Sequence, residues 1–334
     1  MEYSVLGNSG VQVSRLCLGA MMFGSPTHEG DSIKVIERAI DAGINFIDTA
    51  NVYNAGESER IVGKAVQACR DDVLIATKVS GAMGEGLNQS GTSRHHIMMA
   101  VEESLRRLDT DRIDLYYLHR WNALTPIEES LRALDDCVRQ GKIRYIGCSN
   151  FDAWRLCEAW WTSDRMNLEK FICLQPLYNI VNRDVEVELL PFCKAYNVGV
   201  VSYSPLARGV LTGKYLPGQP PPPGSRAARQ DRRILQTELR EESYEVAQEL
   251  QPLAAAHDKT LAQFALAWTL ANPTITSVII GPKSLEQLDD NLGCLDCDIS
   301  PEDEAAVDQL VPPGEHTGKG YNDPMYPVLG RSKE

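Results

Sequence analysis

The sequence lacks a long apolar segment, since nowhere do about 18 apolar residues follow one another without interruption. Its first twenty residues also lack the basic and apolar regions of a secretory signal. Positive charge is scarce: 33 lysines and arginines face 46 aspartates and glutamates, which leaves a formal net charge of −13. A surface for nucleic acid or an anionic membrane would need a basic face. We therefore expect a cytoplasmic protein without nucleic-acid or membrane partners, in which a local group of cations holds any anionic ligand.

Metal-ligand spacing is also scarce. The nine cysteines are an odd number, and most of them, such as Cys17, Cys148 and Cys173, lie in apolar runs, as small buried hydrophobic residues do. Cys294 and Cys297 have CxxC spacing, but neither a second CxxC nor an HxxxH supplies two further ligands for zinc. We expect reduced cysteines and no metal, and the sequence assigns no role to the CxxC pair.

Short apolar runs alternate with amphipathic helical segments to about residue 292, which is typical of a parallel sheet. Eight parallel strands, each followed by a helix, close naturally into a (β/α)₈ TIM barrel, and a chain of 334 residues suits one such domain over residues 1–334. An open doubly wound sheet is the alternative, although no GxGxxG follows the first strand. The candidate strands are Leu16 to Gly19, Asn45 to Asp48, Val73 to Lys78, Asp114 to Leu118, Arg144 to Gly147, Phe171 to Gln175, Val198 to Tyr203 and Thr276 to Ile280.

Two helices have clear boundaries in the sequence. Residues 125–128, Thr-Pro-Ile-Glu, have the spacing of a capping box with proline at the first helical position, and this helix should stop at Gly141. Another helix should begin after Ser93 with its apolar residues on one face. That face consists of Ile97, Val101, Leu105 and Leu108.

Two segments interrupt the alternation. Residues 206 to about 243, after the seventh strand, include PGQPPPPG and the basic stretch SRAARQDRR. A connection of this length is usually functional or disordered. From about residue 312 to residue 334 the chain is rich in Gly, Pro and Tyr, and we expect this tail to lie over the barrel mouth.

Polar residues follow three adjacent candidate strands, which end in FIDTANVY, LIATKV and DLYYLHR. They place Asp48, Tyr53, Lys78 and His119 at strand ends or just after them, where the active site of such a barrel lies. Each residue alone has an ordinary alternative role, as a turn cap, a loop aromatic, a snorkelling lysine or a structural histidine. Their common position instead favours a site in which an acid, a phenol, an amine and an imidazole converge.

The chain resembles the aldo-keto reductases, both bacterial and fungal members and the potassium-channel beta-subunit branch, across nearly its whole length. The resemblance lies in FIDTANVYNAGESE, LIATKV, YYLHR, IGCSNF, LQPLYN, YSPLARGVLTGKY and IIGPKSLEQLDDN, in that order. It implies NADPH-dependent reduction of aldehydes or ketones to alcohols. Tyr53 would donate the proton, Lys78 would bring its phenol pKa down from about 10, and Asp48 would hold Lys78. His119 would orient the carbonyl oxygen or assist proton transfer in alcohol oxidation.

The resemblance also implies which residues bind NADP(H), with the long loop covering the cofactor. Residues after the fifth to seventh strands would hold the nicotinamide and the pyrophosphate, and the last motif the adenosine end. Ser284 and Gln287 mark a helix N-terminus, which together with Lys283 suits the 2′-phosphate. Gln287 would contact the adenine or only complete the cap, and Asp290 stands where the family often has glutamate. The implied cofactor residues are Ser149, Asn150, Gln175, Tyr203, Ser204, Pro205, Leu206, Gly209, Lys214, Arg226, Ile280, Gly281, Lys283, Ser284, Gln287, Asp290 and Asn291.

The small-molecule carbonyl substrate is not identified by the sequence, and neither are the reaction direction and the oligomeric state. Met21, Met22, Phe23 and Trp121 would line an apolar substrate pocket, or else pack at the barrel rim. Two other functions compete with a reductase: an NADP(H)-binding regulatory or sensor subunit with slow turnover, and a different barrel enzyme such as an isomerase or a lyase. The complete set of four polar residues favours the reductase.

Overall fold

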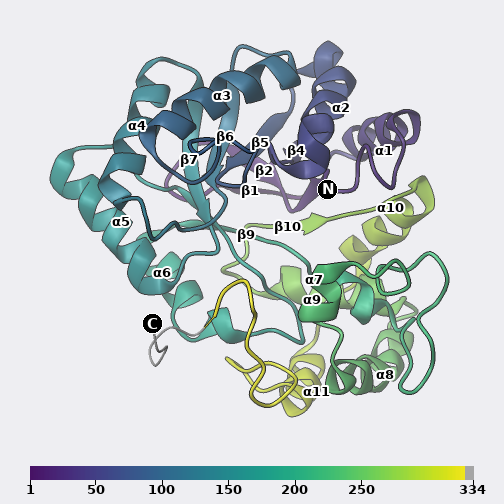
Figure 1. Cartoon of the computed structure of the whole chain (residues 1–334). Helices are drawn as coiled ribbons and strands as arrows, with labels where there is room; N and C mark the ends of the chain where they lie inside the picture. Colours follow the sequence, from purple (N-terminus) through teal and green to yellow (C-terminus); the bar gives the residue numbers. More distant parts are fainter. Residues whose placement is uncertain (328–334) are drawn as a thin grey trace. The chain divides into compact units, whose positions relative to one another are not determined.

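The apolar runs pair into the closed parallel barrel that the sequence predicts (Figure 1). Its strands are β3 (Leu16–Gly19), β4 (Phe46–Asp48), β5 (Leu74–Val79), β6 (Ile113–Leu118), β7 (Ile143–Ser149), β8 (Cys173–Gln175), β9 (Gly199–Ser202) and β10 (Ser277–Ile280). Strands that follow one another in the chain are neighbours in the barrel. Because β10 pairs with both β3 and β9, the sheet has no edge, and the alternative of an open doubly wound sheet is wrong.

The structure is a computed structural model that describes residues 1–327. Contacts divide the chain into two units. The first unit contains the barrel and consists of Met1–Pro176, Glu188–Tyr203 and Pro273–Asp289. The second unit consists of Leu177–Val187, Ser204–Asn272 and the chain from Asp290 onward. A single domain over residues 1–334 stays a prediction.

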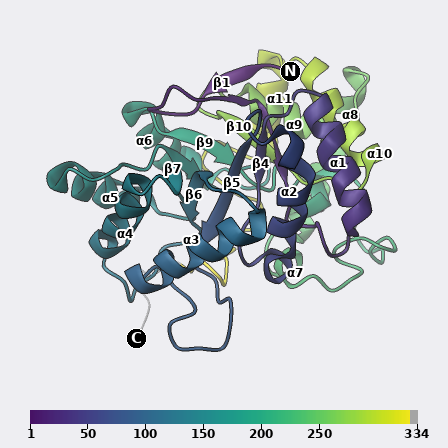
Figure 2. The same ribbon diagram turned by 90° about the horizontal axis from the view of Figure 1, so that it is seen from above.

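Amphipathic helices flank the barrel strands, and Figure 2 shows α2 and α3 outside β4, β5 and β6. The helices are α1 (Glu29–Asp41), α2 (Glu57–Val66), α3 (Arg94–Leu108), α4 (Ile127–Arg139), α5 (Ala153–Met166), α6 (Leu189–Tyr196) and α10 (Leu285–Leu292), with 3₁₀ turns η1 (Tyr53–Gly56) and η2 (Gln67–Cys69). An antiparallel hairpin of β1 (Tyr3–Val5) and β2 (Gln12–Ser14) precedes the barrel. Among residues 1–327, no helix is both long enough and apolar enough to cross a membrane.

Alternate residues of the strands fill the barrel interior, so it is a packed core and not a pore. Its members contact one another and are buried. From the strands they are Cys17, Phe46, Ala76, Leu115, Tyr117, Cys173, Val201 and Ile279. This set fixes which side of each strand faces inward, and hence which residues emerge at the mouth.

The boundaries of the two predicted helices differ in accuracy. Ser93 caps α3 as expected, because its side chain accepts a hydrogen bond from the backbone N–H of His96, and the whole apolar stripe is buried. Gly141 lies beyond the end of α4 at φ 77°, which confirms the predicted stop. The capping box over residues 125–128 is wrong. Pro126 lies outside the helix at φ −54° and ψ 135° with no side-chain cap, and Glu128 pairs with Arg132 instead.

The second unit holds the interrupting loop and the tail. Its elements are η3 (Asp184–Glu186), η4 (Ala207–Thr212), α7 (Arg232–Gln236), α8 (Glu241–Ala256), α9 (Leu261–Ala271), η5 (Gly293–Asp296) and α11 (Pro301–Leu310). The loop therefore contains η4 and α7. Arg233 donates two hydrogen bonds of 3.0 and 2.7 Å to Asp323, which joins α7 to the tail. Tail placement over the barrel mouth stays a prediction, and residues 328–334 of the tail lie outside the described residues.

Candidate active site

The strand pattern delivers polar side chains to one end of the barrel. Because side chains alternate along a strand, the residue two positions after an interior residue also faces inward. Phe46 is thus followed by Asp48, and Ala76 by Lys78. The same spacing leads from Tyr117 to His119, from Cys173 to Gln175 and from Val201 to Tyr203. These are the carboxyl ends of parallel strands, so the five polar residues belong to the same mouth of the barrel.

A buried ion pair forms the centre of this mouth. The Lys78 ammonium donates hydrogen bonds to a carboxylate oxygen of Asp48, to the carbonyl oxygen of Thr49 at 2.7 Å and to the Tyr53 hydroxyl at 3.4 Å. Lys78 has no exposed surface, and Asp48 is 3% exposed. A buried ammonium is costly unless all three of its protons find partners, and here three acceptors surround it.

Charge interactions decide the protonation of this pair. Burial lowers the pKa of the Lys78 ammonium, but the charges of Asp48 and Tyr53 and their hydrogen bonds outweigh burial and raise it above its ordinary value. Burial raises the pKa of the Asp48 carboxyl, and Lys78 and Gln175 oppose that rise. Lys78 is therefore a cation at neutral pH, with its charge directed at the phenol oxygen of Tyr53.

Tyr53 begins η1 in a tightly turned segment. The next two residues, Asn54 and Ala55, have φ angles of 48° and 54°, a region that non-glycine residues rarely occupy. Asn54 stabilises the turn, because its amide donates to the carbonyl oxygens of Phe23 at 2.7 Å and Ser25 at 3.1 Å. The turn therefore holds the Tyr53 ring at a strand end, although Tyr53 lies outside any strand.

His119 follows β6 and contacts Tyr53. The centroids of the two rings lie 5.8 Å apart at an interplanar angle of 81°. Burial, and then the positive charges of Lys78 and Arg120, lower the pKa of His119 to about 3. The imidazole is thus neutral at pH 7 and adds no second cation beside Lys78.

The predicted nicotinamide residues of the first unit are hydrogen-bonded to one another. The side-chain amide of Gln175 donates to Asp48 at 2.8 Å, and the backbone carbonyl oxygen of Gln175 accepts from the Ser149 hydroxyl at 2.8 Å. Asn150, at φ 58°, donates to the backbone carbonyl of His119 at 2.9 Å and accepts from the Tyr203 hydroxyl at 2.8 Å. Asn150 also donates to the Ser149 hydroxyl at 2.9 Å, so the ion pair and these four residues share one continuous polar network.

The last motif contains a helix N-terminus close to the predicted form. The Ser284 hydroxyl accepts from the backbone N–H of Gln287 at 3.3 Å. The Gln287 side chain accepts from the N–H of Lys283 at 2.9 Å, one residue earlier than in a regular capping box. Gln287 therefore takes part in capping α10, and its contact with adenine stays a prediction. Ile280 ends β10 and is buried, whereas Gly281 after it is exposed.

Eight predicted cofactor residues belong to the second unit: Ser204, Pro205, Leu206, Gly209, Lys214, Arg226, Asp290 and Asn291. Gly209, at φ 101°, leaves room for Lys214, whose ammonium nitrogen would lie 2.8 Å from a Cβ added there. Arg226 forms an ion pair with Asp231, in which a guanidinium nitrogen lies 3.6 Å from a carboxylate oxygen. Asp290 accepts hydrogen bonds from Thr260 and Gln263 at the N-terminus of α9, so any cofactor contact of Asp290 would share its carboxylate with that cap.

The four residues predicted to line a substrate pocket differ in exposure. Phe23 has no exposed surface and Met22 is 8% exposed, whereas Met21 is 36% exposed. The guanidinium carbon of Arg155 lies 3.6 Å from the centre of the Trp121 ring. Burial favours rim packing for Phe23 and Met22, and exposure leaves Met21 able to contact a ligand.

Three groups at this mouth are not among the residues predicted from the sequence. The backbone carbonyl of Thr49 completes the Lys78 site, and the Tyr117 ring centre lies 5.9 Å from the Lys78 ammonium. Asn51 is fully buried, and neither of its side-chain polar atoms has a hydrogen-bond partner among residues 1–327. The inward spacing of β6 would have identified Tyr117, but no sequence signal identifies a backbone carbonyl.

Metal ligands do not gather elsewhere in the described chain. Among residues 1–327, no group of three or more His, Cys, Asp or Glu side chains could hold a metal ion. Cys294 and Cys297 are buried free thiols. Burial raises the pKa of Cys294 to about 12 and also raises that of Cys297, so neither thiol is reactive at neutral pH.

Comparison with known proteins gives matches along most of the chain. The family model described as "Aldo/keto reductase family" matches residues 15–312. A probable voltage-gated potassium channel subunit beta of Oryza sativa is 38% identical, covering 89% of this chain and 92% of that protein. The uncharacterized oxidoreductase YrpG of Bacillus subtilis is 37% identical, covering 96% and 99%. Versiconal hemiacetal acetate reductase of Aspergillus parasiticus is 34% identical, covering 94% and 100%.

Proposed function

Because the chain belongs to the aldo/keto reductase family, we propose that it reduces aldehydes or ketones to alcohols with NADPH and that Tyr53 donates the proton. One observation carries this proposal: a buried ammonium, fixed by Asp48, is hydrogen-bonded to the Tyr53 hydroxyl at 3.4 Å. Relatives named as oxidoreductase and reductase support the reaction class. The substrate is a small-molecule carbonyl compound, and the protein acts in the cytoplasm.

The residues around Tyr53 account for proton donation. Carbonyl reduction places negative charge on the carbonyl oxygen, and a proton donor near that oxygen lowers the barrier. Loss of the proton from Tyr53 leaves a phenolate, which the adjacent Lys78 ammonium stabilises. Asp48 keeps that ammonium charged and in position. His119, neutral at pH 7, donates a hydrogen bond to the carbonyl oxygen and orients it. A pKa of about 3 favours orientation over proton transfer as the role of His119.

The donor set supports a phosphorylated nicotinamide cofactor. When bound, the reduced nicotinamide supplies the hydride that side chains cannot supply. Ser149, Asn150 and Gln175 are amide and hydroxyl groups suited to a carboxamide, and Tyr203 offers a ring for stacking. Lys283 and Ser284 at the start of α10 provide a cation, a hydroxyl and the positive end of a helix, which suit a phosphate. Gly209 has no side chain that would crowd the Lys214 ammonium. Lys214 and Arg226 together offer two cations, as binding of a pyrophosphate requires.

A Tyr53→Phe variant tests the proton donor. Loss of the hydroxyl should lower kcat by about 10² to 10⁴ while the Kd for NADPH changes by less than about twofold, because the phenol contacts the carbonyl oxygen and not the cofactor. Loss of NADPH absorbance measures turnover, and a fluorescence titration measures binding. Tyr3→Phe is the matched control, since the exposed hydroxyl of Tyr3, in the N-terminal hairpin, donates to the carbonyl oxygen of Gly43 after α1. Undiminished kcat in Tyr53→Phe would show that another group supplies the proton.

A regulatory subunit is the second candidate, favoured by the 38% identity to a protein named as a potassium channel subunit beta. Family membership does not favour the third alternative, an isomerase or lyase. A turnover screen over aromatic aldehydes, quinones, dicarbonyls and sugars separates the first two. Turnover of any of them supports the reductase, whereas tight NADPH binding without turnover supports the regulatory role.

A further inference from the structure

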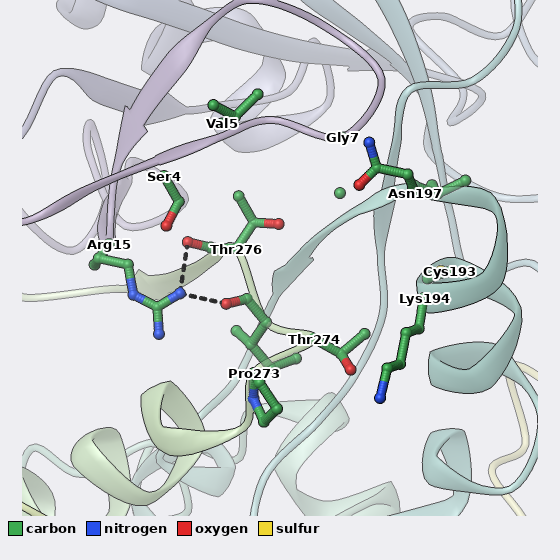
Figure 3. Close-up of a pocket in the computed structure, with 13 residues that line it drawn as sticks. Ser4, Val5, Gly7, Arg15, Cys193, Lys194, Asn197, Pro273, Thr274 and Thr276 are labelled. Carbon is green, nitrogen blue, oxygen red and sulfur yellow. Dashed lines mark hydrogen bonds between the residues drawn. The ribbon is translucent and has the colours of Figure 1, made fainter.

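A cavity of about 320 Å³ lies at the amino ends of the barrel strands, opposite to the end that holds Tyr53. Figure 3 shows the residues that line it. Arg15 precedes β3, Val198 precedes β9, and Thr276 precedes β10, so the amino ends of three neighbouring strands form its wall. Ser4 and Val5 of the N-terminal hairpin and the C-terminal part of α6 complete it. All of these residues belong to the first unit. The active-site residues lie at the carboxyl ends of the strands, so the two sites are separated by the length of the barrel.

Two cations line this cavity from different sides. The Arg15 guanidinium is anchored, because one of its nitrogens donates to the carbonyl oxygens of Ile275 at 2.5 Å and Thr276 at 3.3 Å. Figure 3 shows Lys194, on α6, across the cavity from Arg15. Lys194 is exposed, and it belongs to none of the ion pairs found among residues 1–327.

The remaining wall suits an organic anion. Among the described residues that line the cavity, none is Asp or Glu. Ser4, Thr274 and Asn197 supply short polar side chains, and Val5 and Pro273 supply apolar surface. The C-terminus of α6 contributes about half a negative charge near Asn197, and Glu2, whose charge interacts with Arg15, contributes one more; together they are less than the two full positive charges. Burial lowers the pKa of Arg15, and the charge of Glu2 opposes that fall. Because the pKa of an arginine starts far above neutrality, the guanidinium stays charged.

We propose that this cavity binds a small organic dianion, a dicarboxylate whose two carboxylates contact Arg15 and Lys194 while its carbon chain lies against Val5 and Pro273. Two cations on separate walls favour a ligand with two separated anionic groups over one with a single charge. Within a chain of net charge −13, such a dicarboxylate can be held only where cations gather locally. The site is independent of the proposed reductase activity.

Binding can be measured calorimetrically at low ionic strength on the full-length protein without NADPH or carbonyl substrate, so the result does not depend on catalysis. The probes are succinate, glutarate and adipate, with butyrate as the singly charged comparison and sulfate as an anion without a carbon chain. At least one dicarboxylate should bind at least about tenfold more tightly than butyrate and sulfate, because it contacts two cations. Equal affinity for sulfate would indicate nonspecific anion binding and overturn the proposal. Absence of binding heat from every dicarboxylate at a concentration of about 10 mM would overturn it as well.

Charge reversal at Lys194 locates the site. Lys194→Glu should weaken dicarboxylate binding by about tenfold or more. Because Lys194 is exposed, the variant should fold normally, and its thermal unfolding midpoint checks this. Lys34→Glu, which makes the same charge change on α1, is the matched control and should leave binding unchanged. Equal weakening by both variants would show a general effect of net charge and overturn the proposal. Tyr53→Phe should bind the dicarboxylate normally, whereas competition between the dicarboxylate and a carbonyl substrate would place it at the other mouth and contradict the proposal.

Discussion

Replacement of Lys78 by methionine tests the central ion pair most directly. Methionine keeps most of the length of the lysine side chain but removes the ammonium, and with it the bonds to Asp48, Thr49 and Tyr53. Asp48, 3% exposed, is then left as a buried carboxylate, and among residues 1–327 Gln175 is the side chain that still donates a hydrogen bond to it. Breaking a buried pair in this way typically costs about 3–5 kcal/mol. We expect the free energy of unfolding, measured in urea at pH 7, to fall by that amount.

The double variant Asp48→Asn, Lys78→Met separates stability from catalysis. Removal of both charges leaves no uncompensated carboxylate, so a large part of the lost stability should return. Activity should not return, because no cation remains beside Tyr53, and kcat should stay lowered by about 10² to 10⁴ in both variants.

The pH dependence of the unfolding free energy of Lys78→Met provides a further test of the role of Asp48. In Lys78→Met, loss of the counter-ion raises the pKa of the buried Asp48 carboxyl further above its unfolded value than in the wild type, so the folded variant binds the additional proton more tightly. Stability relative to wild type is then greatest below the unfolded pKa of about 3.9 and is lost as pH rises through the folded pKa. The stability deficit should thus be smaller at pH 4 than at pH 7. A Lys78→Met protein with wild-type unfolding free energy and wild-type kcat, or a double variant as unstable as the single one, would refute this reasoning.

Four further predictions concern His119, Lys283 and two glycines. The pKa of His119 is held at about 3, so a plot of kcat against pH should show no transition near 6.5, and one that disappears in His119→Gln would contradict this assignment. Since the unfolded histidine takes up its proton near 6.5, His119 should make stability rise with pH between about 3 and 6.5, a slope that His119→Gln should flatten in urea titrations. Lys283→Met should raise KM for NADPH by about tenfold and leave KM for NADH nearly unchanged, and an equal rise for both would exclude recognition of the 2′-phosphate. Gly63→Ala should lower the free energy of unfolding by about 1–3 kcal/mol, because the added Cβ would lie 2.2 Å from the Leu108 carbonyl oxygen. Gly30→Ala in α1, where the space around the glycine is open, should instead raise the free energy of unfolding by about 0.5 kcal/mol.

The barrel could be predicted from the sequence because its signals are local. A strand's inward residues recur every second position and a helix's apolar face every three or four, so the positions of β3 to β10 follow from short windows of sequence. The same spacing places Asp48, Lys78 and His119 at strand ends of one mouth. It also places Tyr53 just after its strand, but the role of Tyr53 as proton donor needed the resemblance to a known family. No local pattern indicates the turn around Tyr53, which has positive φ angles at Asn54 and Ala55.

Local signals failed where a side chain had a choice of partners. Thr125 has the spacing of a capping residue, yet Pro126 takes an extended conformation and α4 begins without a side-chain cap. Gln287 was expected to complete a regular box, and it caps the N–H of Lys283 instead. In both cases the cap depends on the path of the backbone, which the spacing of residue types does not give.

The sequence by itself determined which residues reach the mouth of the barrel, because strand periodicity is a property of neighbouring residues. The tertiary structure alone decided what those residues do to one another. Lys78 is a buried cation beside Tyr53 because Asp48 and the carbonyl of Thr49 come from the neighbouring strand end, and His119 is neutral because burial and Lys78 oppose its charge. Protonation depends on distances and burial across strands, which no stretch of sequence contains.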